Sequence, residues 1–402
     1  MISKNMLDFN FSTGVIICTI IGISTLLYAT IFGLCNFKKI LKFHKNCLPD
    51  LSSPSNQGLP KASVIVYAYK SQNFIRQYLE SLLNQDYPDF EIIIVNDSVK
   101  DDMTKEIVED MCNNHSNLHI TYVPQDSRNV SRRKLAITLG IKAATGDVVI
   151  TTAANCKIKS DQWLKQMMRH FCNSKTEIVL GYTHIDKVAQ QGIGKWYRAF
   201  DSLTTAIQWI GSALAKRTYR GDGFNLAYRK SVFFNNKGFA KTIHLENGED
   251  DLFINQIATT DNCVVELSDE SQLIVDWAGN EQRMWFDMKE RYTFTSRYLK
   301  TNAFYLQNIF YLSLWLSIFL LCESSIIALP NLIPAISSLI LIIGYFAYMI
   351  YLYRQVANKL NSIKLFWALP LFVLIKPLVD FAYKLRFNGR KSNNFTWQRK
   401  KN

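Results

Sequence analysis

The sequence lacks the cysteine spacings of a metal or disulfide framework. Its eight cysteines are scattered through 402 residues without a C-x-x-C pair, and Cys18 and Cys322 lie within uncharged apolar runs. Zinc sites show closely spaced cysteine pairs, and disulfide scaffolds are dense in cysteine and short. We therefore expect reduced, structural cysteines in a cytoplasmic domain.

Nucleic-acid-binding motifs are also lacking, although the chain carries a net charge of +13. No helix-turn-helix, zinc-finger or aromatic RNP-type pattern accompanies the basic residues. Lysines beside apolar runs commonly face anionic lipid headgroups. The excess charge is therefore interpreted as a membrane-surface feature, and nucleic acid is not an expected partner.

Charge is missing from three long apolar runs, at residues 14–34, 304–322 and 332–353. A helix of about 20 apolar residues crosses a bilayer core, so each run is a predicted span. The first is too long for a signal-peptide core and lacks a small-x-small cleavage pattern, which indicates a retained anchor. A fourth run, 365–375, is short, contains Pro370 and ends at Lys376. We predict a re-entrant or interfacial segment there, and a span over 365–383 is the alternative.

Basic residues after the first span set the expected orientation. Lys38, Lys39, Lys42 and Lys45 follow it directly. By the positive-inside rule the segment beyond is cytoplasmic, in a multi-pass protein of the plasma (inner) membrane. The tail 384–402 is basic and holds no acid, so a cytoplasmic tail favours the non-spanning alternative for 365–383.

Four short apolar runs alternate with helical patterns between residues 62 and 152. Strands are predicted at 63–67, 91–95, 118–123 and 148–152. Helices are predicted at 74–84, 103–113 and 134–144, and Asn73 is the expected N-cap of the first. This alternation indicates βαβ units and a mostly parallel sheet, an α/β fold. No G-x-G-x-x-G follows the first strand, which disfavours a dinucleotide oxidoreductase. Ligands in such sheets bind beyond the carboxyl ends of the strands, here near Tyr67, Asp97 and Ala153.

Beyond the fourth strand the alternation is lost. Helices are expected at 162–171 and 252–258 and a strand at 177–182, while 283–300 is basic and amphipathic, as interfacial helices are. Segment 193–214 is long and aromatic. We expect its aromatic residues to pack in a core; the alternative is that they lie on the membrane surface. These residues are Trp196, Tyr197, Phe200 and Trp209.

Seven short segments occur in one order and at one spacing: SVIVY (63–67), QDYPDFE (85–91), VNDS (95–98), KLAITLG (134–140), ATGD (144–147), NLAYRK (225–230) and GEDDL (248–252). Together they resemble membrane-anchored family 2 glycosyltransferases with the GT-A fold. The resemblance covers roughly residues 61–300. The resemblance implies a GT-A domain at 62–300. The apolar runs and the charge pattern predict an anchor at 1–36, a basic juxtamembrane linker at 37–61, a membrane region at 301–383 and a cytoplasmic tail at 384–402.

The resemblance also implies site residues. Asp250, between Glu249 and Asp251, matches the acid that deprotonates the acceptor in an inverting transfer; a helix N-cap is the alternative role. Arg291 and Tyr292 match residues that hold the acceptor end and the diphosphate. Nucleotide-binding positions are Tyr67, Tyr69, Asp97, Lys134, Ala153 and Asn155. A strand-end turn remains the alternative for Asp97, and a solvated helix start for Lys134 and its neighbour Arg133.

Three motifs depart from the family pattern. Ala153-Ala154-Asn155 stands where members carry Asp-x-Asp, Met288 to Tyr292 replaces Gln-x-x-Arg-Trp, and Lys70-Ser71 stands where many members have Asn-Glu. The family uses Mg²⁺ or Mn²⁺, but Asn155 offers one neutral oxygen, a weak ligand for a hard cation. No metal site is therefore predicted with these residues.

Two hypotheses follow. The first is a membrane-bound hexosyltransferase moving sugar from a nucleotide sugar, a UDP-sugar by preference, to a membrane lipid or glycan acceptor, with Arg291 and Lys134 replacing the charge of the metal. The second is a catalytically impaired homologue that acts as scaffold or regulator of an envelope polysaccharide or glycolipid synthase and contacts its subunits. A transporter is disfavoured, because the two clear C-terminal spans hold no charge.

Overall fold

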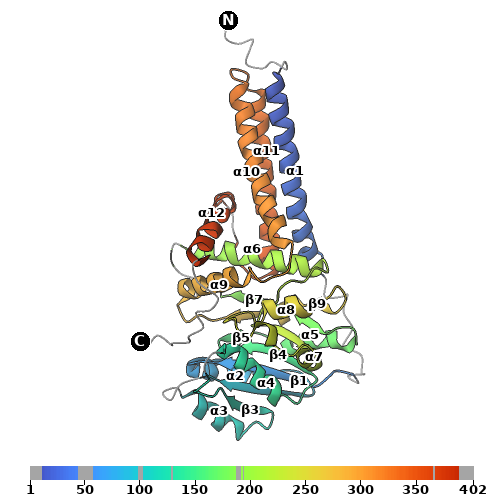
Figure 1. The fold of residues 1–402 in the computed structure, drawn as a ribbon, viewed down its shortest axis with the longest axis vertical. Coiled ribbons are helices and arrows are strands. Elements are labelled where there is room, and N and C mark those ends of the chain that lie inside the picture. Colours follow the sequence, from blue (N-terminus) through green and yellow to red (C-terminus); the bar gives the residue numbers. More distant parts are fainter. Residues whose placement is uncertain are drawn as a thin grey trace. The chain divides into compact units, whose positions relative to one another are not determined.

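The computed structural model describes residues 11–43, 58–97, 103–127, 130–186, 192, 194–364 and 367–388 (Figure 1). Lys45, most of the predicted linker 37–61 and most of the predicted tail 384–402 lie outside these residues. The chain forms two compact units. One comprises residues 1–42, 196–211 and 301–382, and the other comprises 43–195, 212–300 and 383–402. The predicted division into five segments stays a prediction.

The second unit is built on a seven-stranded sheet in the order β3-β2-β1-β4-β8-β6-β9. Strands β1 (Ala62–Ala68), β2 (Phe90–Asn96), β3 (Leu118–Tyr122) and β4 (Val148–Ala153) are parallel, as predicted. Strand β8 (Leu226–Arg229) runs antiparallel between β4 and β6 (Ile178–Leu180), and β9 (Cys263–Val265) pairs in parallel with β6. The mixed α/β architecture with a mostly parallel sheet is confirmed.

Helices connect these strands. They are α2 (Gln72–Leu83), α3 (Thr104–Cys112), α4 (Arg132–Ala143), α5 (Trp163–Met168) with η2 (Arg169–Cys172), α7 (Lys230–Asn235), η3 (Ala240–Thr242), α8 (Asp251–Ile257), η4 (Asp269–Ser271) and α9 (Glu281–Thr295). All but α7, η3 and η4, which were not predicted, lie close to predicted positions. Helix α2 begins after Ser71, so Asn73 is not its N-cap. The Ser71 hydroxyl instead closes a turn on the backbone of Tyr69.

A second sheet was not predicted from the sequence. Strands β5 (Cys156–Ile158), β10 (Leu273–Val275) and β7 (Thr183–Ile185) pair in the order β5-β10-β7. Each has only three residues, too few to display a period of two. Because β5 follows β4 after two residues, this sheet fixes the path of the chain just beyond the β4 tip.

A buried carboxylate organises the amino ends of β1, β2 and β4. Oε1 of Glu91 accepts hydrogen bonds from the Ser63 hydroxyl (2.6 Å) and from the amide and hydroxyl of Thr145 (2.6 and 2.8 Å). The amide of Gly146 also donates to Ser63 Oγ at 2.9 Å. Three of the sequence segments therefore meet at one structural cluster, on the edge of the sheet opposite its carboxyl ends.

Three helices of the first unit are long and apolar enough to cross a membrane: α1 (Thr13–Leu41), α10 (Ala303–Ile327) and α11 (Ile333–Lys359). They correspond to the three predicted spans. Glycines allow close packing among them, since a Cβ at Gly22 would lie 3.0 Å from Leu321 Cγ. Helix α12 (Leu369–Asn388) does not meet the same length and composition criteria within the described residues.

The aromatic helix α6 (Lys195–Leu214) packs within the first unit. Phe200 is fully buried, with ring centroids 6.0 Å from Tyr353 of α11 and 5.7 Å from Phe372 of α12. Trp209 is also buried, whereas Trp196 is 38% exposed. The Lys376 ammonium of α12 forms a buried ion pair with Asp201 of α6. Core packing is confirmed for Phe200 and Trp209.

Candidate functional site

Three of the predicted nucleotide positions meet at the carboxyl ends of β1, β2 and β4. Tyr67 pairs with Val95 of β2 on one side and with Ala153 of β4 on the other. The amide of Asp97 donates to Ala68 O at 2.8 Å, and the amide of Ala154 to Tyr67 O at 3.0 Å. The parallel register thus brings Tyr67, Asp97 and Ala153 to one edge.

Asp97 is an ion-paired residue at this edge, and not merely a strand-end turn residue. Its Oδ2 accepts the Tyr67 hydroxyl at 2.8 Å, and its Oδ1 accepts Arg132 Nε at 2.6 Å. Asp97 and Arg132 are 1% and 5% exposed. Burial and the adjacent Asp97 carboxylate raise the pKa of Tyr67 well above its usual value, so the phenol stays a donor.

Tyr69 lies just beyond β1 and is 39% exposed. The next residue, Lys70, has a φ of 50°, and its ammonium lies 5.9 Å from the Tyr69 ring centroid. The chain turns at Lys70, so Tyr69 lies outside β1, whereas Tyr67 lies within it.

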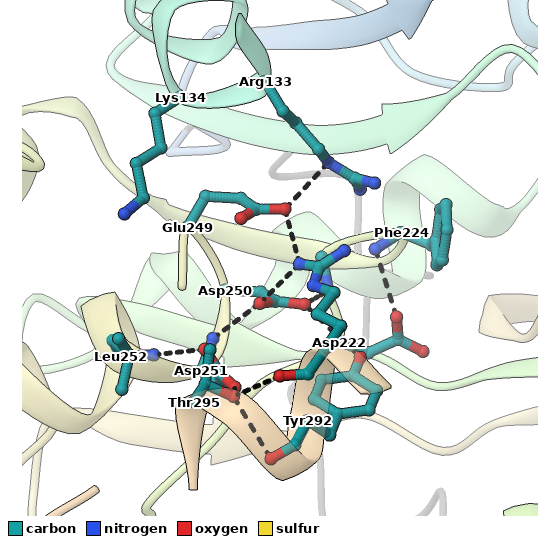
Figure 2. Close-up of polar contacts among 12 residues, drawn as sticks. Arg133, Lys134, Asp222, Phe224, Glu249, Asp250, Asp251, Leu252, Tyr292 and Thr295 are labelled. Carbon is teal, nitrogen blue, oxygen red and sulfur yellow. Dashed lines mark hydrogen bonds and ion pairs between the residues drawn. The ribbon is translucent and has the colours of Figure 1, made fainter. Parts of the chain in front are cut away.

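The acidic triplet lies at the start of α8, where Asp250 is the N-cap residue. As N-cap, its Oδ1 accepts the Asp251 amide at 2.8 Å. The same oxygen lies 2.8 Å from Arg291 Nη2 (Figure 2). Its Oδ2 accepts the Gly223 amide at 3.3 Å and faces the Tyr292 hydroxyl at 3.5 Å.

The flanking acids differ in their partners. Glu249 Oε1 lies 2.9 Å from Arg133 Nε and also pairs with Arg291 (Figure 2). Asp251 accepts the Leu252 amide at 2.7 Å and the Thr295 hydroxyl from α9. Glu249 therefore bridges two arginines at the site, while Asp251 fastens α9 to α8.

These contacts separate the proton affinities of the acids. Burial alone would raise the pKa of Asp250, but Arg291, Arg133 and Arg220 bring it below its usual value. Burial and the charge of Asp250 raise the pKa of Asp251 to about 6. Asp250 is therefore a charged carboxylate at neutral pH.

Lys134 lies in this region but does not face the strand tips. Its Nζ donates to the carbonyls of Thr242 (2.5 Å) and Leu245 (2.9 Å). It is 1% exposed, which excludes a solvated helix start, and burial lowers its pKa to about 8. Figure 2 shows Arg133 and Lys134 leaving α4 on different sides, with Arg133 directed toward Glu249.

The residues at the degenerate Asp-x-Asp position do not fit a divalent cation. Ala153 and Ala154 provide no side-chain oxygen, and Asn155 Nδ2 donates to Asp276 O at 2.9 Å. The Asp276 carboxylate accepts the Tyr78 hydroxyl at 2.6 Å and the Ala278 amide at 2.8 Å. Within the described residues no group of three or more His, Cys, Asp or Glu side chains could hold a metal ion.

Sequence reasoning missed Arg132, Arg220 and Gly223. Arg220 stacks on Tyr292 with its guanidinium carbon 3.4 Å from the ring centroid. A signal for Arg132 was present, because three cations (132–134) begin α4, where the helix dipole disfavours positive charge. Such a run indicates that nearby acids compensate it, as Asp97 and Glu249 do.

Comparison with known proteins agrees with this geometry. Residues 63–234 match the model of the family described as glycosyl transferase family 2. EpsH of Bacillus subtilis, named as a glycosyltransferase, is 26% identical over 204 residues, covering 48% of this chain and 54% of that protein. TuaG of the same organism, named for teichuronic acid biosynthesis, is 29% identical over 150 residues, covering 36% and 55%.

The chain thus spans about half the length of these curated relatives. Among solved structures, a mannosyltransferase of Pyrobaculum calidifontis in complex with GDP-Man and Mn²⁺ superposes with a TM-score of 0.56 at 16% identity, covering 93% of this chain and all of that one. That likeness concerns the fold. Residues 63–234 are thus similar to glycosyltransferase family 2, and the fold of the chain is the GT-A fold.

Proposed function

We propose that the protein is a membrane-bound glycosyltransferase that moves a sugar from a nucleotide sugar to a membrane-proximal lipid or glycan acceptor with inversion. The observation that carries the proposal is the adjacency of two charged clusters at one sheet edge. Asp97 with Arg132 forms the first, and Glu249 and Asp250 with Arg133 and Arg291 form the second. The nucleobase, the diphosphate and the acceptor hydroxyl of the substrates would each find a side chain of suitable chemistry there.

Asp97 is proposed to hold the nucleobase. Its carboxylate accepts the Tyr67 hydroxyl at this end of the sheet, and a carboxylate is an acceptor suited to an N–H donor. A uracil or guanine ring offers such an N–H. We favour a UDP-sugar, and the GDP-Man in the P. calidifontis structure makes a guanine nucleotide the first alternative.

Asp250 is proposed to be the base. It would take the proton of an acceptor hydroxyl while that oxygen bonds to the anomeric carbon and the bond to the diphosphate breaks. The departing diphosphate takes the electron pair, and arginine stabilises the charge that develops on it. The negative charge of a bound diphosphate would offset the arginines that lower the pKa of Asp250, so donor binding would strengthen the base.

The membrane setting is also part of the proposal. We propose that three helices span the membrane and that the catalytic domain, residues 62–300, lies on the cytoplasmic side. The acceptor would then be at the bilayer surface. The lysines in the last turn of α1 and just after it favour that orientation. The naming of TuaG for teichuronic acid biosynthesis suggests an envelope glycan as the acceptor class.

The test uses the full chain purified in detergent. Wild type should bind UDP and release UDP from a UDP-sugar when an envelope lipid or glycan extract is added. Asp250→Asn should reduce that release about 10²- to 10⁴-fold, the usual range for loss of a general base, while UDP binding persists. Asp261→Asn, an exposed acid after α8, is the control and should act as wild type. If neither UDP nor GDP binds, with or without Mn²⁺, the proposal is wrong.

A second candidate is a catalytically impaired homologue that supports a synthase. It is favoured by the loss of both Asp-x-Asp carboxylates and by the arginine partners that occupy Glu249 and Asp250 in the free protein. This candidate predicts a folded chain that releases no UDP with any extract. Acceptor-dependent UDP release that is lost in Asp250→Asn would exclude it.

A further inference from the structure

We propose that the Arg133 guanidinium takes the place of the divalent cation at the donor diphosphate, so that nucleotide binding requires no metal. The inference rests on the proposed nucleotide-sugar site and specifies its chemistry. It concerns a nucleoside diphosphate as ligand and one cation of this chain as its counter-charge.

The β4 tip cannot supply the usual counter-charge. Two of its three positions are alanine, and the amide of Asn155 is bonded to the Asp276 backbone. A diphosphate in a poorly solvated site still needs neutralising charge, because an unpaired buried anion is costly. That charge must then come from side chains near the tip.

Arg133 lies where this charge is needed. Its guanidinium carbon is 5.6 Å from the centroid of the Tyr67 ring, and Tyr67 pairs with Ala153 at the tip. On another side it lies 5.0 Å from the Phe224 ring centroid. The two rings border the guanidinium and offer cation–π contact. The planar fork of an arginine matches phosphate oxygens in pairs.

Three nearby cations already have hydrogen-bond partners, and Arg220 is stacked on Tyr292. Arg132 is bonded to Asp97, Lys134 to two backbone carbonyls, and Arg291 to both Glu249 and Asp250. Arg133 has one ion pair, through Nε to Glu249, and its terminal nitrogens have no hydrogen-bond partner in the described part of the chain. Figure 2 shows these nitrogens on the far side of the guanidinium from Glu249. Arg133 can therefore contact a phosphate while its own position stays fixed by Glu249.

Glu249 acts as a competitor in this arrangement. Its Oε1 attracts both Arg133 and Arg291, so an incoming diphosphate must share or displace it. Removing the charge of Glu249 should therefore strengthen nucleotide binding, whereas removing that of Arg133 should weaken it. A role for Arg133 limited to packing would predict no strengthening in the Glu249 variant.

The experiment measures UDP binding to the full chain in detergent by titration calorimetry, in excess EDTA and again with Mn²⁺; GDP is titrated if UDP gives no heat. Wild type should bind with the same Kd, within about threefold, in both conditions. Arg133→Gln should raise Kd about 10- to 100-fold in EDTA, the range for loss of one charge-assisted contact. Glu249→Gln should lower Kd. Lys142→Gln, an exposed cation on the same helix α4, is the matched control and should leave Kd unchanged.

The outcomes separate the two proposals. Binding that appears only with Mn²⁺ would overturn the inference and leave the nucleotide-sugar site standing. Unchanged binding in Arg133→Gln, or weaker binding in Glu249→Gln, would also overturn the inference. Absence of UDP and GDP binding in both conditions would overturn the proposed function together with it. The wild-type comparison needs no variant, so it decides the metal question even if Arg133→Gln fails to fold.

Discussion

The buried Asp97–Arg132 ion pair tests what stabilises the chain at the carboxyl ends of β1, β2 and β4. Arg132→Met removes the cation and leaves the Asp97 carboxylate buried with the Tyr67 hydroxyl as a remaining donor. The pair is almost fully buried, so loss of one partner should cost about 3–5 kcal/mol. For a domain of this size that corresponds to a fall in unfolding midpoint on the order of 10 °C.

The assay is thermal unfolding of the full chain in detergent, followed by tryptophan fluorescence, with midpoints compared only among variants. Asp97→Asn should lose a similar amount, because it leaves the buried guanidinium uncompensated. The double variant leaves neither charge alone, so it should recover about half of the summed losses. Arg76→Met, an exposed arginine on α2, is the control. Additive losses in the double variant, or an Arg132→Met midpoint equal to that of Arg76→Met, would refute the reasoning.

Three further predictions concern the scaffold. Burial alone would raise the pKa of Glu266, but His170 and Arg169 hold it at about 2. The stability that the Glu266 carboxylate provides above pH 4.5 should therefore be lost as pH falls from 4.5 toward 2. Over that pH range the unfolding midpoint of Glu266→Gln should decline less than that of wild type. Gly146→Ala places a Cβ 2.7 Å from a backbone carbonyl and should cost about 1–3 kcal/mol, whereas Gly344→Ala, with open space around it, should be neutral in the same melt. Lys376→Met removes the cation that is paired with the Asp201 carboxylate and should destabilise the first unit by about 3–5 kcal/mol. In detergent this single variant should be digested by a protease faster than the Asp201→Asn/Lys376→Met double variant.

The first half of the fold was predictable because its strands are nearly continuous apolar runs. β1, β2 and β4 are buried on both faces, and such runs mark central parallel strands whatever surrounds them. The strands of the second sheet were not predictable, because β5, β7 and β10 each contain three residues and are stabilised by partners distant in sequence. The partners of Phe200 on α11 and α12 are likewise separated from it by more than 150 residues, so the sequence could indicate that it is buried and not what covers it.

The site shows a similar division. Tyr67, Asp97, Asp250 and Arg291 could be assigned to one region, because parallel strands present their carboxyl ends at one edge. The roles of Arg133 and Lys134 could not be separated from the sequence. Successive residues on a helix point about 100° apart, and α4 begins two residues before its predicted start. Only the three-dimensional path shows which cation faces the tips.

The shared pairing of Glu249 with Arg133 and Arg291 has a consequence for selectivity among anions. Inorganic phosphate and other small anions would have to break existing ion pairs to enter, and they would gain nothing elsewhere to offset that loss. At the proposed site a nucleotide would gain contacts at Asp97 in the same event. The carboxylates thus set an entry threshold that a lone anion does not reach and that a ligand with a base at one end and phosphates at the other can exceed.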